Sequence, residues 1–202
     1  KAEWKSLMIA RKKANVPLVI GSCGTCGTNG MVDWMENITI ELAEELNQNI
    51  KIAKLYCQQE KNFIKKKFQL SKIFPLNPAP MLNDHLIEEM TNIVALAGAE
   101  QIQECINTGA EIILAGRTTD TAIISALPLM KGANPGSSWH GAKVVECGAL
   151  CSTNPTSGVV MVEFDKTGFT VEPMSKNAFC TSETVAAHML YENADPYILH
   201  EP

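Results

Sequence analysis

The chain has 202 residues, which is long enough for one large domain or one and a half and excludes a small fold held together by disulfides. Its residues are 46% hydrophobic and 19% charged, the composition of a folded globular chain rather than of a disordered one. With 17 Lys and Arg against 22 Asp and Glu, the formal net charge is −5, so no general basic field exists to bind nucleic acid.

Alternating short apolar runs and amphipathic stretches predict an α/β fold with an open, mainly parallel sheet flanked by helices. The expected strands lie at residues 16–20, 50–57, 92–97 and 110–115. The expected helices lie at residues 1–14, 31–46, 58–70, 99–108, 120–130 and 137–150.

After residue 157 the pattern changes from parallel to antiparallel structure. Apolar runs at 159–164 and 169–171 flank a turn with glycine, which predicts a hairpin, and a helix is expected from 182 to about 193. The sequence therefore predicts an α/β core at 1–153 and, at 154–202, a hairpin–helix extension or the start of a second unit.

The apolar runs, the cysteines and the two ends of the chain indicate the cellular location of the protein. The longest apolar runs are far shorter than the roughly 20 residues of a membrane helix, so no membrane segment is expected. Seven cysteines, an odd number, lie mainly within apolar patterns, which favours free thiols in the cytoplasm. The chain begins without Met or a secretory signal and stops directly after helix-like sequence, so we expect a segment of a longer protein.

The small-residue loop at 21–30 follows the first strand and precedes a helix, where open parallel sheets bind their ligands. Glycine lets backbone N–H groups approach an anion, and the helix N-terminus adds positive charge. Ser22, Gly24 and Thr25 are therefore candidate residues for binding phosphate or carboxylate. The spacing matches neither a P-loop nor a dinucleotide fingerprint, so a tight turn whose glycines serve only packing stays open.

Two further features accompany this loop. Cys23 and Cys26 form a C-x-x-C pair before a helix, which allows a redox role, although one such pair cannot complete a zinc site. Asp33, early in the following helix, either joins the site or only stabilises the helix dipole. The sequence assigns no metal ligands.

The loop at 116–120 again follows a buried strand. Arg117 offers a planar fork for a carboxylate or phosphate, and Thr118 and Asp120 could orient it or bind a substrate hydroxyl. The alternative is a helix cap without a ligand, in which Arg117 pairs with Asp120.

A third group lies on the helix expected at 137–150. His140, Lys143 and Cys147 share one helical face, and Glu146 lies next to Lys143 around the helix. Such a set can perform acid–base chemistry. The alternative is a surface Lys–Glu pair and a histidine that caps the helix.

Five separated motifs occur in order along the chain, at residues 16–34, 115–122, 126–128, 139–149 and 190–196. Over nearly the whole chain they resemble the acyclic terpene utilisation (AtuA) family. The resemblance implies a cytoplasmic enzyme or enzyme subunit of carbon catabolism, with hydro-lyase or C–C lyase chemistry on an acyl-CoA or small hydroxy acid.

The resemblance further implies that the candidate residues line one cleft, namely Ser22, Thr25, Asp33, Arg117, Asp120, His140, Lys143 and Glu146. In this interpretation Arg117 and the glycine loop bind the anionic part of the substrate. His140, with either Glu146 or Asp120, exchanges protons next to a carbonyl. A non-catalytic anion- or nucleotide-binding or regulatory subunit is the alternative. No cofactor is identified, and a homo-oligomer or a partner subunit stays open.

Overall fold

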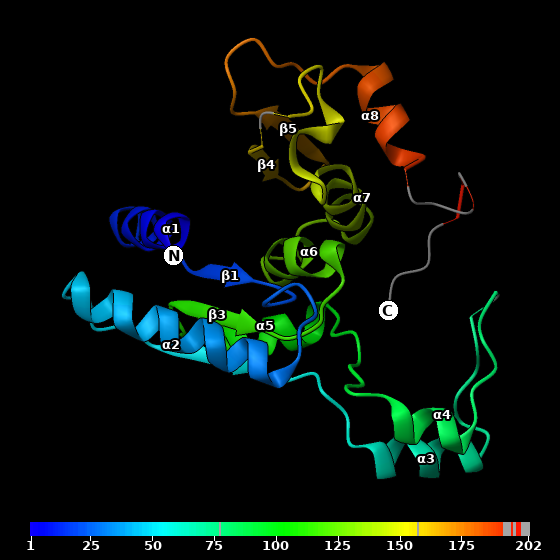
Figure 1. The fold of residues 1–202 in the computed structure, drawn as a ribbon. Coiled ribbons are helices and arrows are strands. Elements are labelled where there is room, and N and C mark those ends of the chain that lie inside the picture. Colours follow the sequence, from blue (N-terminus) through cyan, green and yellow to red (C-terminus); the bar gives the residue numbers. More distant parts are fainter. Residues whose placement is uncertain (77, 157, 192–194, 196, 199–202) are drawn as a thin grey trace. The chain divides into compact units, whose positions relative to one another are not determined.

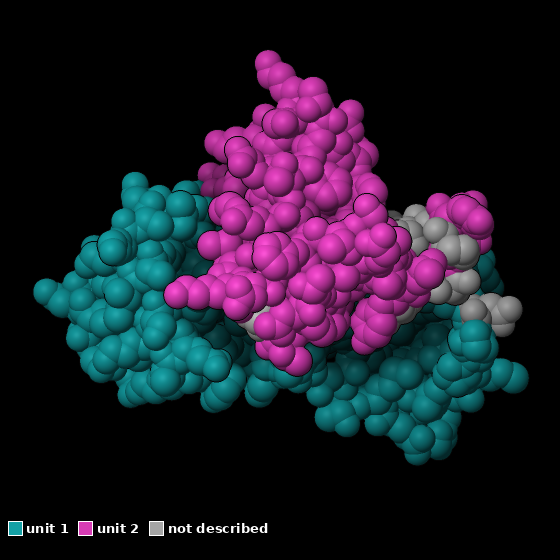
Figure 2. Space-filling view, turned by 90° about the horizontal axis from the view of Figure 1, so that it is seen from above, with its two compact units in different colours: residues 1–96, 109–117 teal, residues 97–108, 118–202 magenta. Residues whose placement is uncertain are grey.

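The computed structural model describes residues 1–76, 78–156, 158–191, 195 and 197–198, which contain both helices and strands (Figure 1). They form two compact units, each with its own core: residues 1–96 with 109–117, and residues 97–108 with the described part of 118–202 (Figure 2). The domain division expected after residue 153 stays a prediction, because compactness alone does not show which parts fold independently.

The first unit is built on a three-stranded parallel sheet of β1 (Leu18–Ile20), β2 (Ile52–Leu55) and β3 (Ile112–Ala115). The strand order is β1-β3-β2, so β3 pairs with both neighbours. Every residue of β3 is buried, which explains its unbroken apolar run. The predicted open α/β fold with a parallel sheet is confirmed.

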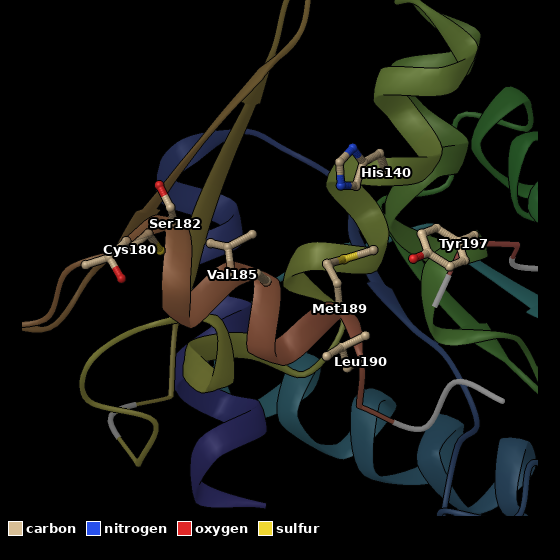
Figure 3. Close-up of a pocket in the computed structure, with 9 residues that line it drawn as sticks. His140, Cys180, Ser182, Val185, Met189, Leu190 and Tyr197 are labelled. Carbon is tan, nitrogen blue, oxygen red and sulfur yellow. The ribbon is translucent and has the colours of Figure 1, made fainter. Parts of the chain in front are cut away.

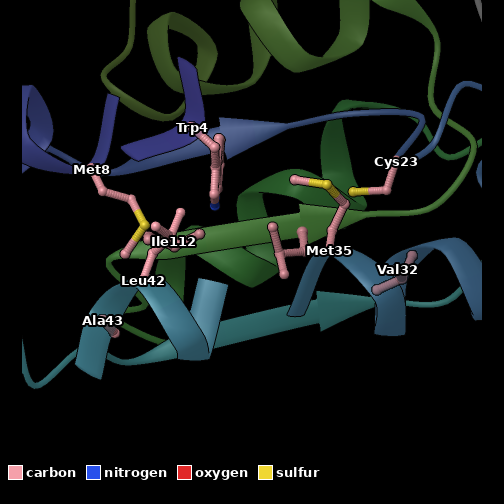
Figure 4. Packing of buried hydrophobic residues seen from close by; sticks show 9 residues of the cluster. Trp4, Met8, Cys23, Val32, Met35, Leu42, Ala43 and Ile112 are labelled. Carbon is pink, nitrogen blue, oxygen red and sulfur yellow. The ribbon is translucent and has the colours of Figure 1, made fainter. Parts of the chain in front are cut away.

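Two helices, α1 (Ala2–Ala14) and α2 (Asn29–Glu45), form the main core of this unit with the sheet (Figure 4). Alternate residues of β3, Ile112 and Leu114, share this core with both helices. The indole N–H of Trp4 in α1 donates to Thr39 Oγ1 in α2 at 2.9 Å. The helices are thus fixed to each other as well as to the strand that ends at Ala115.

Residues 57–96 contain α3 (Lys61–Gln69) and α4 (Asp84–Glu89). The Asn83 side chain caps α4 by accepting from the Leu86 amide at 2.8 Å, and the sequence analysis did not predict this helix. The strand predicted at 92–97 is wrong. Val94 and Ala97 make only isolated bridges to different partners, so no continuous ladder forms.

The second unit contains helices, one 3₁₀ turn and a hairpin. In chain order they are α5 (Ala99–Asn107), α6 (Asp120–Met130), α7 (Pro135–Val145), η1 (Gly148–Cys151), β4 (Val160–Phe164), β5 (Phe169–Pro173) and α8 (Ser182–Met189). The pairing of β4 with β5 confirms the predicted antiparallel hairpin. Within the described residues, each helix is too short or too polar to cross a membrane.

Two helix ends differ from the prediction. The helix expected to reach residue 150 stops at Val145, and a 3₁₀ turn follows, because Gly148 adopts a positive φ of +59° that an α-helix cannot continue. The last helix ends at Met189, and its predicted end near residue 193 lies outside the described residues. Glu146 and Cys147 therefore follow α7 instead of lying within it.

Candidate functional site

The two strand-end loops of the first unit lie against each other at the carboxyl ends of β1 and β3. The Ser22 amide donates to the Gly116 carbonyl oxygen at 2.8 Å. The guanidinium Nη1 of Arg117 donates to Ser22 Oγ at 3.4 Å. Ser22 and Arg117, which the sequence analysis took from separate loops, are therefore neighbours.

The glycine loop after β1 has an unusual backbone. Ser22, Gly24, Thr25 and Gly27 all have positive φ, between +48° and +67°. Amides of the loop already have partners, since those of Ser22, Cys26 and Gly27 donate to backbone carbonyl oxygens at 2.8–3.0 Å. Because the turns themselves use these donors, the amides of Ser22, Cys26 and Gly27 are engaged within the protein, and the predicted binding of an anion by the loop stays a prediction.

Asp33 on α2 connects this helix to the end of β2. Its carboxylate accepts hydrogen bonds from the Tyr56 hydroxyl and, at 3.1 Å, from Lys54 Nζ. The Tyr56 hydrogen bond, followed by that of Lys54, holds the pKa of Asp33 below its ordinary value. The same ammonium lies 2.7 Å from Glu36, whose hydrogen bond is the main cause of the raised pKa of Lys54. Asp33 thus has a structural role, and its predicted part in substrate binding stays a prediction.

The two cysteines of the C-x-x-C pair differ in burial and in the pKa of their thiols. Cys23 is fully buried, and burial raises the pKa of its thiol to about 11. Cys26 is exposed, and hydrogen bonds from the backbone and then the hydroxyl of Thr28 lower its pKa. Burial and a raised pKa keep Cys23 from forming a thiolate at neutral pH, which works against a redox role for the pair.

At the start of α6 in the second unit, the side chains differ in accessibility. The Thr119 hydroxyl caps the helix by accepting from the Ala122 amide at 3.2 Å. Thr118 is buried, with 1% of its surface exposed, whereas Asp120 is exposed. Of these two predicted site residues, Thr118 and Asp120, only Asp120 can be reached directly by a ligand in solvent.

Lys143 and Glu146 form an ion pair at the end of α7, as their spacing predicts. Their side chains are only 12% and 7% exposed, so the alternative of a surface pair is wrong. His140 lies one turn earlier, within the helix and exposed, and it does not cap the helix. Its ring meets that of Phe169 in β5 edge to face, with the centroids 5.3 Å apart.

An open cavity of about 750 Å³ lies between His140 and one face of α8 (Figure 3). Apolar side chains of α8 and the hydroxyl groups of Thr181 and Ser182 contribute to its lining. The residues that line it are His140, Cys180, Thr181, Ser182, Val185, Ala186, Met189, Leu190 and Tyr197. The sequence analysis missed the contribution of α8. The three- and four-residue spacing of these α8 side chains is the signal that it overlooked.

Contacts between predicted site residues are thus found within each unit. Ser22 and Arg117 are in contact in the first unit, and Lys143 and Glu146 in the second. That all the candidate residues line one cleft stays a prediction.

The family model described as acyclic terpene utilisation family protein AtuA matches residues 5–202. Neither a curated protein nor a solved structure gives a match. Because the match extends over nearly all of the sequence and the five motifs lie within it, the chain belongs to the acyclic terpene utilisation (AtuA) family.

Proposed function

We propose that this chain provides substrate-binding and proton-transfer groups of a carbon-catabolism enzyme with lyase or hydratase chemistry. Its substrate is an acyl-CoA or a small hydroxy acid with an apolar chain. The observation that carries the proposal is the position of His140 at an apolar cavity of about 750 Å³. Family membership supports the catabolic setting. The seven cysteines, all within the described residues, form no disulfide in the structure, which supports a cytoplasmic location.

The proposed chemistry begins with removal of a proton from the carbon next to a carbonyl. Imidazole is the side chain most often used for such transfers, and an exposed ring beside a cavity can reach a bound substrate. Asp120 or Glu146 is the second acid–base group. The apolar side chains of α8, such as Val185 and Met189, suit the hydrocarbon part of the substrate.

Arg117 and Ser22 are proposed to bind the anionic part of the substrate. The guanidinium is a strong, fixed donor for carboxylate or phosphate, and its hydrogen bond to the Ser22 hydroxyl fixes one of its nitrogens. A lysine at position 117 keeps the positive charge but cannot donate the two parallel hydrogen bonds of a guanidinium. We therefore expect Arg117→Lys to weaken substrate binding more than it slows the proton transfer.

Exchange of hydrogen for deuterium tests the proposal without knowledge of the final product. The protein is incubated in D₂O with acyl-CoA thioesters and small hydroxy acids, and mass spectrometry measures deuterium at the carbon next to the carbonyl. His140→Gln is expected to slow this exchange by roughly 100-fold or more, the usual contribution of a general base. The matched control is His85→Gln, a histidine on α4 whose side chain is 81% exposed.

The outcomes separate the two candidate functions. If the wild type catalyses deuterium exchange and His140→Gln does not, the result supports the proposal that the chain is an enzyme. Exchange at the wild-type rate in His140→Gln would remove His140 from the mechanism. Saturable binding of the same compounds without any exchange would favour the alternative, a non-catalytic anion-binding or regulatory subunit.

A further inference from the structure

Three side chains with metal-binding atoms lie together in the second unit. Glu146 and Cys147 follow the last turn of α7, and His188 lies in the last turn of α8. A carboxylate oxygen, the Cys147 sulfur and a ring nitrogen of His188 all lie within 4.8 Å of one another. Residues 41 positions apart in the sequence thus present oxygen, sulfur and nitrogen atoms to one point.

His188 supplies an independent reason to expect a ligand there. The residue is only 5% exposed, and within the described part of the chain its Nε2 is buried without a hydrogen-bond partner. Its ring stacks on that of Tyr191, with the centroids 6.2 Å apart, and this contact gives Nε2 no hydrogen bond. An unsatisfied buried nitrogen is costly, and a metal ion bound at a ring nitrogen would offset part of that cost.

We propose that Glu146, Cys147 and His188 bind a divalent transition-metal ion of the zinc type. Thiolate, imidazole and carboxylate are the ligands that zinc takes in proteins. Zinc–ligand bonds of about 2.0–2.3 Å place tetrahedral ligand atoms roughly 3.5 Å apart. The three ligand atoms lie within 4.8 Å of one another, so the distances between them need to shorten by little more than about 1 Å. Three protein ligands leave the fourth position of a tetrahedral ion for water or another small ligand.

The surroundings are compatible with this assignment. Lys143 pairs with Oε1 of Glu146, an arrangement that orients the carboxylate as the outer partners of metal ligands commonly do. When the ion binds, the Cys147 thiol gives its proton to solvent, and the two anionic ligands balance the charge of the ion. The proposal goes beyond the proposed function, because it concerns binding of an ion and assigns no step of a reaction; the two share Glu146, whose role as a ligand favours Asp120 as the second acid–base group.

Cobalt(II) provides the test, since a cobalt–thiolate bond gives a charge-transfer absorption in the near ultraviolet. The purified protein is freed of metal with a chelator and titrated with cobalt(II) and then with zinc(II), in competition with a chromogenic chelator. We expect one ion per chain, zinc displacing cobalt, and the thiolate band. Cys147→Ser should remove the band, and Cys147→Ser and His188→Gln should each weaken binding by at least about tenfold.

The other thiols supply matched controls. Cys26→Ser removes the exposed cysteine of the C-x-x-C pair, and Cys180→Ser removes the partner of Cys151, whose sulfur lies 3.9 Å away. Both variants should keep the ion and the band. Loss of binding in either control, its persistence in Cys147→Ser, or the absence of saturable binding would overturn the proposal.

Because His188 is buried, His188→Gln is accepted only if its circular dichroism matches the wild type. Should that variant fail to fold, Glu146→Gln decides in its place, since Glu146 offers the third ligand. Cobalt affinity reduced at least about tenfold supports the site, and unchanged affinity overturns it.

Discussion

Replacing Gly27 with alanine tests how closely the two strand-end loops of the first unit approach each other. A Cβ at this position would lie 2.3 Å from the backbone nitrogen of Arg117 and 2.6 Å from its Cα. These are backbone atoms at the end of a buried strand, so they cannot move aside as the end of a flexible side chain can. The φ of +67° adds the cost of a left-handed conformation.

The magnitude follows from these two contributions. A left-handed alanine costs about 1–2 kcal/mol relative to glycine, and overpacking typically costs about 1–3 kcal/mol. We expect Gly27→Ala to lower the free energy of unfolding by about 3 kcal/mol or more. In a chain of this size the melting temperature should fall by roughly 10 °C.

Two neighbouring glycines provide comparisons. Gly30 lies in α2 with no atom within 4 Å of an added Cβ, so Gly30→Ala should stabilise the chain by up to about 1 kcal/mol. Gly24 also has positive φ, and its Cβ would lie 2.5–2.7 Å from Sδ, Cγ and Cβ of Met31, of which the last is fixed to the backbone, so a loss of stability is expected here too. Urea unfolding measures all three variants. Equal stability of Gly27→Ala and Gly30→Ala would refute the close approach of the loops.

Two further predictions concern ionisable side chains of the first unit. Tyr56→Phe should raise the pKa of Asp33 toward its ordinary value, because the hydroxyl is the main cause of the lowered pKa. Since the folded-state pKa lies below the ordinary value near 4, the contribution of ionised Asp33 to stability is present above about pH 4 and lost as the pH falls through the folded-state pKa. A carboxyl NMR titration measures the shift, and an unchanged pKa would contradict it. An alkylating reagent at neutral pH should modify Cys26 rapidly and Cys23 only after unfolding, because Cys26 is exposed with a lowered pKa and Cys23 is buried with a pKa of about 11. Peptide mass spectrometry distinguishes the two sites, and equal rates would disprove the difference.

The sheet and the hairpin were predictable because their signals are local. An unbroken apolar run such as Ile112–Ala115 is typical of a strand buried on both faces. The glycine turn between β4 and β5 predicts their antiparallel pairing without reference to any other segment. In each case the residues that carry the signal also form the element.

Features that depend on distant partners were not predictable in this way. The apolar stretch at 92–97 has the composition of a strand, but within the described residues it makes isolated bridges, from Val94 to Gln58 and from Ala97 to Thr118, which periodicity cannot reveal. The contact of Arg117 with Ser22 requires β3 to pair directly with β1, and the sequence alone does not supply that strand order. Likewise, the spacing of Lys143 and Glu146 predicts their contact but not its burial.

Accessibility distinguishes the two carboxylates that could assist His140. A group that exchanges protons with a substrate must touch it, whereas a metal ligand needs only to reach the ion. The Glu146 side chain is 7% exposed and paired with Lys143, while Asp120 is exposed at the start of α6. We therefore expect Asp120→Asn to slow deuterium exchange without changing cobalt affinity, and Glu146→Gln to lower cobalt affinity. If exchange is lost in Glu146→Gln and unaffected by Asp120→Asn, the proton-transfer role returns to Glu146.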